Sequence, residues 1–240
     1  MKFTLLTYNL FHNKAVGRIR EIVEKENPDI LCFQEIATDV KNFESVENLG
    51  YKLADYSNFL WRKNTIFGIA IFYKANRFVY VESNSINLPH NFIGAFLQLF
   101  RFHKKSRDVL KANFVEKEKR KKFIIYNVHL TAFSTNKLRK RQIKNVLPDL
   151  KAHTNTPIIV AGDFNYPYGR RYFEDLFSQY DLQEATKNIF FTYKRRILLL
   201  LSLTFKNDYI LYKNLKEIST KRLDIYESDH FPILSEFEID

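Results

Sequence analysis

The feature that most constrains the fold is a series of short apolar runs rich in β-branched and aromatic residues. Runs of roughly four to eight such residues are typical of strands buried on both faces. Hydrophobic residues make up 45% of the 240-residue chain, which is ample for a packed core. We therefore predict strands at Phe3–Tyr8, Ile30–Phe33, Ile66–Tyr73, Val109–Phe114, Phe123–Val128, Ile158–Ala161, Asp208–Tyr212 and Ile233–Phe237.

Amphipathic segments between some of these runs predict helices on the outside of the sheet. The stretch from Gly68 to Leu130 contains no convincing helix, so strands and helices alternate only in part. This favours a mixed sheet, or two sheets packed together, over a purely doubly wound fold. We find no repeat or linker and expect one domain over residues 1–240. The predicted helices are Val16–Lys25, Asp39–Leu49, Asn136–Leu150, which Pro148 should bend or end, and Arg170–Gln179.

Polar residues stand at the ends of the apolar runs, where ligand sites of α/β folds collect. Carboxylates brought together there could not all stay ionised without a compensating positive charge. Such an oxygen-rich site suits Mg²⁺, Mn²⁺ or Ca²⁺, and a neighbouring histidine supplies an acid or base near neutral pH. These parts suit metal-assisted attack on a phosphate ester. The residues concerned are Asn9, Glu35, His129, Asp163, Asn165, Asp208, Asp229 and His230.

Each of these residues also has a purely structural explanation. Asn9 could form a turn, Glu35 could favour the start of the following helix, and Asp163 to Asn165 could be an Asx turn. Asp208 could be a surface acid, and a single histidine is usually a satisfied core or rim residue. All of these explanations would have to hold at once, which favours the functional interpretation.

Six short motifs follow one another along the chain: T-Y-N-L (7–10), F-Q-E (33–35), N-V-H-L (127–130), G-D-F-N (162–165), N-D-Y-I-L (207–211) and S-D-H-F-P-I (228–233). In this order they resemble the endonuclease/exonuclease/phosphatase superfamily of metal-dependent phosphodiesterases, which includes deoxyribonuclease I. The resemblance covers residues 3 to 237 and implies a four-layer sandwich: two mixed β-sheets packed face to face with helices on the outside.

The resemblance also implies a role for each position. Glu35 corresponds to a metal-binding glutamate, with Asn9 and Asp229 beside the metal. Asp163 corresponds to the residue that positions or activates the attacking water. His230, oriented by Asp208, and a second histidine, His129, would contact the scissile phosphate, and Asn165 would donate to its oxygens. Arg107 and Tyr73 are weaker candidates for substrate contacts. H-L at 129–130 is more similar to the deoxyribonuclease, sphingomyelinase and phosphatase branches than to the abasic-site endonucleases.

Net charge limits the partners without choosing among them. The chain carries a formal charge of +11, which favours an anionic partner. We favour nucleic acid, with phospholipid or phosphoinositide head groups at a membrane surface as the alternative. An inactive binding protein on this fold is a third hypothesis, although the complete residue set argues against it. The apolar segments Phe92–Phe100 and Ile197–Leu203 could contact an anionic membrane, or could be buried strands or cover a sheet edge.

The cysteine content and the lengths of the apolar stretches bear on the cellular compartment. Cys32, the single cysteine, lies in an apolar run and is expected to be a buried hydrophobic residue. No stretch resembles a signal peptide or reaches the ~20 apolar residues of a membrane-spanning helix. We therefore expect a cytoplasmic monomer that could bind a membrane peripherally.

Overall fold

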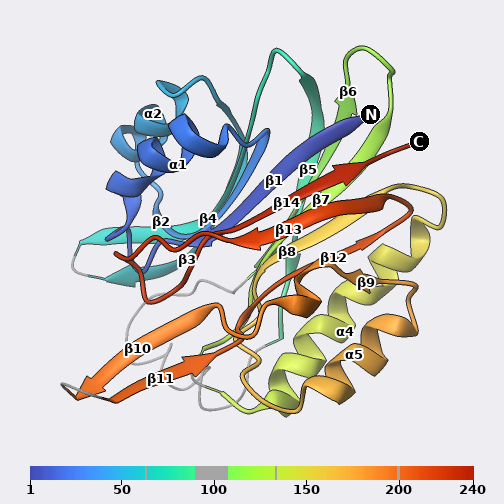
Figure 1. Ribbon diagram of the computed structural model, residues 1–240. Helices are drawn as coiled ribbons and strands as arrows, with labels where there is room; N and C mark the ends of the chain where they lie inside the picture. The colour runs from blue at the N-terminus through green and yellow to red at the C-terminus, as the bar shows by residue number, and fades with distance from the viewer. Residues whose placement is uncertain (63, 90–107, 133, 199–200) are drawn as a thin grey trace.

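Two six-stranded sheets form the centre of the molecule (Figure 1). This computed structural model describes residues 1–62, 64–89, 108–132, 134–198 and 201–240. The first sheet runs in the order β13 (Lys216–Arg222), β14 (Ile233–Glu238), β1 (Lys2–Asn9), β2 (Ile30–Ala37), β4 (Thr65–Tyr73), β3 (Lys52–Arg62). The second runs β5 (Phe78–Asn87), β6 (Asp108–Glu116), β7 (Lys122–His129), β8 (Ile158–Asp163), β12 (Asp208–Lys213), β9 (Gln183–Glu184).

Both sheets are mixed, as predicted. The β1–β2 and β7–β8 pairs are parallel, and the other strand pairs within these sheets are antiparallel. The inner faces pack on each other through one apolar cluster that contains Phe3, Ile71, Phe114 and Ile210. Cys32 is buried in this cluster, as expected.

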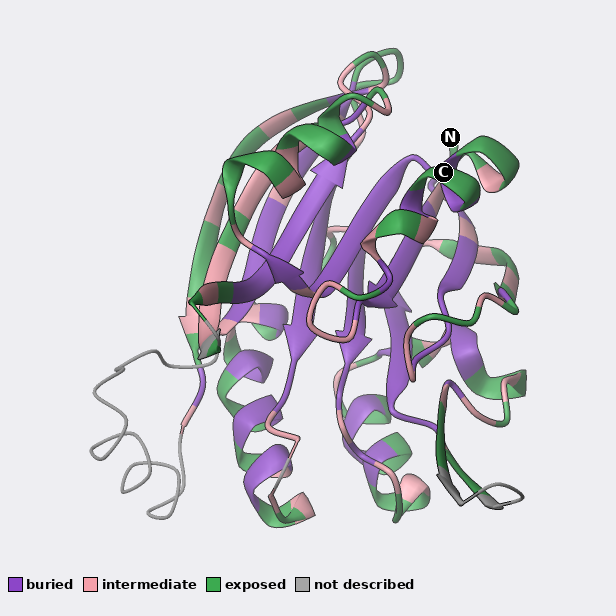
Figure 2. Ribbon diagram, turned by 90° about the vertical axis from the view of Figure 1, so that its left-hand side faces the viewer, coloured by how far each residue is buried: buried purple, intermediate pink, exposed green. Residues whose placement is uncertain are grey.

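Helices cover the outer face of each sheet. α1 (Ile19–Glu26), preceded by the short 3₁₀ helix η1 (Val16–Arg18), and α2 (Val40–Glu47) pack on the first sheet. α4 (Asn136–Ala152) and α5 (Arg170–Ser178) pack on the second. Figure 2 shows the result: the central strands are buried, strands at the edges are partly exposed, and the helices bury the faces turned to the sheets. The predicted four-layer sandwich is therefore confirmed.

Pro148 does not end α4, contrary to one of our two expectations. The helix continues to Ala152, four residues further, because its last turn is attached to the second sheet. Lys213 Nζ donates to the carbonyl oxygen of Leu150 at 2.8 Å, and Lys111 Nζ donates to Asp149 Oδ1 at 3.1 Å. These contacts compensate for the helical hydrogen bond that proline cannot donate.

Outside the two sheets, β10 (Tyr193–Leu198) and β11 (Leu201–Phe205) form a separate two-stranded ribbon. The described part of the apolar segment Ile197–Leu203 forms strand in this ribbon and pairs with neither six-stranded sheet. Leu203 is 45% exposed. The segment Phe92–Phe100 lies outside the described residues. Among the described helices, none is long and apolar enough to cross a membrane.

Candidate functional site

The strand register brings the predicted polar residues to one end of the two sheets. Asn9 ends β1 and is paired in register with Gln34, the neighbour of Glu35 on β2. His129 ends β7 and is paired with Asp163 at the end of β8, and Asp208 at the start of the antiparallel β12 also pairs with Asp163. The convergence predicted from the sequence is therefore a consequence of strand order and direction.

Asp163 is held by two side-chain amides. Its Oδ2 atom accepts from Asn9 Nδ2 at 3.0 Å and from Asn165 Nδ2 at 2.9 Å, and its Oδ1 atom accepts from the backbone N–H of Asn165 at 2.8 Å. Asn165 Nδ2 also donates to the carbonyl oxygen of Leu130 at 3.1 Å. Asn9 and Asn165 thus fix the carboxylate, and both amide hydrogens of Asn165 are engaged here.

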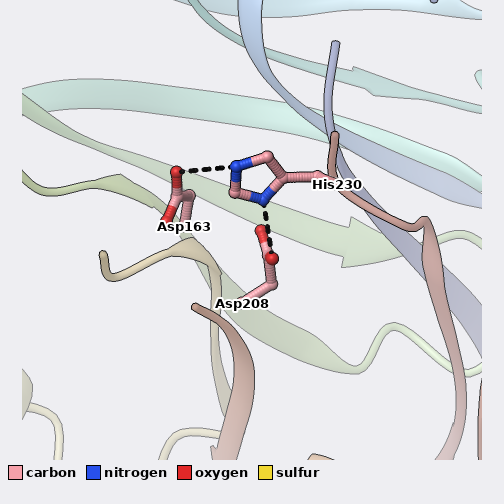
Figure 3. A group of neighbouring side chains, drawn as sticks. All are labelled: Asp163, Asp208 and His230. Atoms are coloured by element: carbon pink, nitrogen blue, oxygen red, sulfur yellow. Dashed lines mark hydrogen bonds and ion pairs between the residues drawn. The ribbon is translucent and has the colours of Figure 1, made fainter. Parts of the chain in front are cut away.

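His230 lies between Asp163 and Asp208 (Figure 3). Its Nδ1 atom is 2.8 Å from Asp208 Oδ2, and its Nε2 atom is 3.7 Å from Asp163 Oδ2. Thr192 also donates from Oγ1 to Asp208 Oδ2 at 2.7 Å. Because a carboxylate can only accept, Nδ1 carries a proton toward Asp208 and Nε2 faces the site. On the other side, the ring of Tyr193 packs edge-on against His230 at 5.0 Å.

Glu35 reaches the site through an irregular backbone. Its φ of 56° is in the left-handed region, and the β2–β4 register shifts between Gln34 and Ile36, which marks a β-bulge. Glu35 Oε1 is 3.4 Å from Asn9 Nδ2, whereas Oε2 accepts from the backbone N–H of His12 at 3.0 Å and lies 3.0 Å from His12 Nδ1. The bulge therefore directs Glu35 toward Asn9 and the first loop.

The two remaining predicted residues border the same group. His129 Nε2 is 3.7 Å from Glu35 Oε1 and 3.6 Å from Asp163 Oδ2, and its ring packs edge-on against Phe59. Asp229 Oδ1 is 4.0 Å from His230 Nε2. The structure thus brings together Asn9, Glu35, His129, Asp163, Asn165, Asp208, Asp229 and His230.

Burial and crowding perturb the acids of this group. Burial raises the pKa of Asp163, and the negative charges of Asp208 and Glu35 add to this effect. The pKa of Asp229 is raised by burial and by Glu35. Burial would lower the pKa of His230, but Asp208 and Asp163 outweigh it and raise that pKa. The carboxylates of the site therefore repel one another, and its histidines do not fully neutralise their negative charge.

A divalent cation fits this excess of carboxylate oxygens. Within the described residues, ligand atoms of Asp163, Asp208 and His230 all lie within 4.8 Å of one another and could hold an ion. Asp208 Oδ2, however, already accepts from Thr192 and is paired with His230 Nδ1. The Asp208–His230 pair therefore already has its partners within the protein. The side chains of Glu35 and Asp229, in contrast, are 15% and 16% exposed to the solvent.

The two weaker substrate candidates are not part of this arrangement. Tyr73 ends β4 but is paired with Ile30, at the start of β2 and so at the opposite end of the sheet from Glu35. Its ring lies in the core between the sheets, beside Phe114 at 5.4 Å. The structure places Tyr73 away from the predicted group because β2 and β4 are antiparallel. Arg107 lies outside the described residues.

Two further residues, Thr192 and His12, hold the site from loops and were not among the predicted residues. Thr192 bonds Asp208 through its hydroxyl, which also accepts from the backbone N–H groups of Asn207 and Asp208 at 3.0 and 2.9 Å. His12 contacts Glu35 and lies 3.3 Å through Nε2 from Arg62 Nη1. His12 follows Asn9 by three positions, and Thr192 directly follows the apolar residues Ile189–Phe191, so both carried a signal that could have been noticed.

Comparison with known proteins agrees with this geometry. The sequence profile described as the Endonuclease/Exonuclease/phosphatase family matches residues 6–230. A search of curated proteins gave no significant match. Among solved structures, the human Nocturnin catalytic domain with a bound sulfate anion has 23% identity and a TM-score of 0.78, covering 100% of this chain and 95% of that one.

Two further structures are similar. ANGEL2, a 2′,3′-cyclic phosphatase, in complex with adenosine-2′,3′-vanadate has 16% identity and a TM-score of 0.76, covering 100% of this chain and 96% of that one. A mannosyl-6-phosphatase of Bacteroides thetaiotaomicron has 18% identity and a TM-score of 0.71, with coverages of 98% and 99%. At these identities the structures establish the fold. Together with the profile match over nearly the whole sequence, they show that this chain belongs to the endonuclease/exonuclease/phosphatase family.

Proposed function

We propose that this protein is a divalent-metal-dependent phosphodiesterase that cleaves nucleic acid. The observation that carries the proposal is the buried Asp208–His230 pair beside Asp163. His230 Nδ1 is 2.8 Å from Asp208, and His230 Nε2 faces Asp163 at 3.7 Å. An acid–base pair of this kind, next to a carboxylate held by two amides, can move a proton and stabilise charge at one point.

We place the metal at Glu35, Asn9 and Asp229, with Mg²⁺ as the expected ion. Glu35 and Asp229 supply the partly exposed carboxylates, and Asn9 links Glu35 to Asp163 through its amide. When bound, the ion would polarise the phosphate and neutralise charge that develops on its oxygens. The pKa of Glu35 supports this placement: burial would raise it, but the hydrogen bond from His12 and nearby histidines outweigh burial and lower it. Glu35 is thus held as a carboxylate.

The chain's own residues supply the remaining chemistry. Asp163, with its pKa raised by burial, is the group that takes a proton from the attacking water. His230, protonated on Nδ1 toward Asp208, donates from Nε2 to a phosphate oxygen. His129, whose Nε2 atom is 3.6 Å from Asp163 Oδ2, is the proposed donor to a second. Asn165 orients Asp163, and its proposed contact with phosphate would exchange one of the two hydrogen bonds that it makes here.

Nucleic acid is favoured as substrate on charge. The chain carries +11, and the first nine residues of α4, N-K-L-R-K-R-Q-I-K, contribute four cations outside the core, Lys137, Lys140, Arg141 and Lys144, whereas Arg139 is buried. Phosphate neutralisation by such residues supplies much of the affinity for nucleic acid. The similar structures do not choose the substrate, because one is a 2′,3′-cyclic phosphatase and another a mannosyl-6-phosphatase.

The test is a cleavage time course with Mg²⁺ on supercoiled plasmid and on end-labelled single-stranded DNA and RNA, with and without EDTA. Wild type, His230→Ala and His153→Gln are compared side by side. His153 is a matched control because it caps the end of α4 remote from the site. Removing one preorganised donor should lower the rate by about 100-fold or more.

The result expected is metal-dependent cleavage that His153→Gln retains and His230→Ala loses. Equal cleavage by wild type and His230→Ala would contradict the assigned chemistry. If a folded wild type that binds Mg²⁺ cleaved no nucleic acid, the proposal that nucleic acid is the substrate would be contradicted. A binding protein without catalytic activity would also show no cleavage.

A second candidate substrate is the phospholipid head group, because the β10–β11 ribbon carries Arg195 and Arg196 near the exposed Leu203. Cations beside apolar residues favour an anionic membrane surface. Hydrolysis of sphingomyelin or phosphoinositides in vesicles, reduced in Leu203→Ser, would support this function. Vesicles that neither bind the wild type at low salt nor are hydrolysed would argue against it.

A further inference from the structure

A surface beside the site combines exposed tyrosines with unpaired cations. It is formed where α4 and α5 begin, at the lower edge of Figure 1, and the two segments are linked by the hydrogen bond from Asn136 Nδ2 to the carbonyl oxygen of Tyr168 at 2.8 Å. Tyr168 is 63% exposed and Tyr172 is 48% exposed. We call this surface the tyrosine–lysine patch; it comprises Lys137, Lys140, Arg141, Lys144, Tyr168, Arg171 and Tyr172.

The rings of the patch are held in place by the fold. Gly169 has a φ of 75° and precedes α5, so the chain turns sharply between Tyr168 and Tyr172. Lys140 Nζ lies 3.0 Å from the centre of the Tyr172 ring, which fixes this ring from the side of α4. Tyr166 below is buried and stacks on Phe173 at 4.3 Å and 12°. Large exposed rings on a fixed support lose little conformational entropy on binding.

The cationic side chains of the patch form no ion pairs among the described residues. Among the ion pairs formed within the described part of the chain, none involves Lys137, Lys140, Arg141, Lys144 or Arg171. Arg170 next to them is different, since it pairs with Glu174 and Glu184. Asp175, one turn further along α5, is an acid that takes part in none of these ion pairs either. Because the five unpaired cations outnumber this one acid, the patch presents a positive surface to the solvent.

The patch is continuous with the catalytic group. Tyr168 follows Asn165 by three residues, which limits the distance between their Cα atoms to about 11 Å. Asn165 bonds Asp163, as described above. Arg139 of α4 is buried and donates through Nε to the carbonyl oxygen of Thr131 at 3.0 Å, so α4 also fixes the segment that follows His129. One ligand could thus contact the site and the patch together.

From this juxtaposition we infer that the tyrosine–lysine patch binds a single-stranded nucleic acid, with bases stacked on Tyr168 and Tyr172 and phosphates beside the lysines and arginines. The inference rests on the proposed function and names the part of the substrate that lies outside the reacting phosphate. Unpaired bases stack on exposed aromatic rings, whereas the bases of a duplex already stack on each other.

The test measures binding without turnover, by fluorescence anisotropy of labelled single-stranded DNA and RNA 12-mers in EDTA over a series of KCl concentrations. Tyr168→Ala and Tyr172→Ala should each weaken binding about tenfold, at an unchanged salt slope. The double variant Lys137→Gln/Arg141→Gln should reduce the slope of log K against log salt by about 1.4, because each phosphate that is neutralised on a single strand accounts for about 0.7 of that slope.

Matched controls lie elsewhere on the surface. Tyr56→Ala removes a ring that is 41% exposed on β3, in the other sheet, and Lys117→Gln/Lys119→Gln removes two exposed charges at the β6–β7 turn. Both should bind as wild type does. Thermal unfolding of every variant shows that a loss of affinity is not a loss of fold.

The outcomes separate the inference from the proposed function. Tyrosine-dependent binding by a protein that cleaves no nucleic acid with Mg²⁺ would uphold the inference and refute the function. Cleavage with unaltered binding by both tyrosine variants, or no binding by the wild type in EDTA, would overturn the inference. Tighter binding to a duplex of the same sequence, or to phosphatidylserine vesicles through the same residues, would also overturn it.

Discussion

Replacing Gly162 with alanine tests how closely β7 and β8 must approach to place Asp163. Gly162 has a φ of 141°, and a Cβ atom there would lie 2.0 Å from the carbonyl oxygen of Val128. Because real Cβ contacts are at least 3.0 Å, the strands would have to separate locally by about 1 Å. Val128 and Gly162 are paired in register and precede His129 and Asp163. The substitution therefore acts on both the fold and the site.

The expected magnitude has two parts. The backbone conformation costs an alanine roughly 1–3 kcal/mol, and a weakened buried hydrogen bond between the strands costs roughly 1–3 kcal/mol more. The total of about 4 kcal/mol corresponds to a fall in Tm of about 8–16 °C for a chain of this size. Displacing Asp163 by about 1 Å should also lower phosphodiesterase activity by about 100-fold.

Two other glycines serve as matched controls in the same assay, a thermal unfolding curve followed by circular dichroism. Gly17 has nothing within 4 Å of its Cβ position, so Gly17→Ala should change stability by less than about 1 kcal/mol. Gly50 has a φ of 94° but open space, so Gly50→Ala should lose only the conformational part, about 1–2 kcal/mol. If Gly162→Ala unfolded within 2–3 °C of wild type, about 1 kcal/mol, the argument from close approach would be refuted.

Three further changes have expected outcomes. Thr192→Val leaves buried partners of its hydroxyl unsatisfied and should cost about 1–3 kcal/mol and some activity, both recovered in Thr192→Ser; unchanged melting would contradict the role assigned beside Asp208. At Asp149, burial alone would raise the pKa, but hydrogen bonds, including that from Tyr126, lower it. The ionised Asp149 therefore stabilises the folded state above its ordinary pKa of ~3.9, and this stabilisation is lost as the pH falls through the lower pKa of the folded state. The difference in Tm between wild type and Asp149→Asn should shrink below about pH 4. A difference in Tm that does not change with pH would contradict this. Glu35→Gln should weaken Mn²⁺ binding, measured by electron paramagnetic resonance without substrate. If the variant bound Mn²⁺ as tightly as wild type, the proposal that Glu35 is a metal ligand would be contradicted.

The sequence predicted the centre of each sheet and missed its edges. All predicted strands are interior strands: β14, β1, β2 and β4 of the first sheet, and β6, β7, β8 and β12 of the second. The strands that were missed, β13, β3, β5 and β9, are the four at the sheet edges, together with the β10–β11 ribbon. An interior strand is covered on both faces and is therefore an unbroken apolar run. β13, with the sequence K-E-I-S-T-K-R, has one solvated face and resembles a polar loop.

The residues of the site were predictable to the extent that they end interior strands. Asn9, His129 and Asp163 are the last residues of β1, β7 and β8, so the apolar pattern itself marks them. The residues that contact the site from loops are marked less clearly, because the short apolar run Ile189–Phe191 before Thr192 belongs to no strand. Thr192 stands before the ribbon and contacts Asp208 only because the chain returns from the ribbon directly into β12.

The loop after β1 shows most clearly why tertiary contacts decide the rest. Phe11, His12 and Asn13 all have φ between 48° and 64°, a left-handed turn that only the asparagine tolerates readily. Local propensity would exclude this conformation, yet it directs consecutive N–H groups to the site. Those of Phe11 and His12 donate to Asn9 Oδ1 and Glu35 Oε2, and that of Asn13 donates to the carbonyl oxygen of Glu35. Because Glu35 is itself in the left-handed region, the loop and the bulge stabilise each other's backbone, and neither can be predicted from its own residues. Glu35, which we propose as a metal ligand, is thus oriented by a conformation that the sequence pattern does not contain.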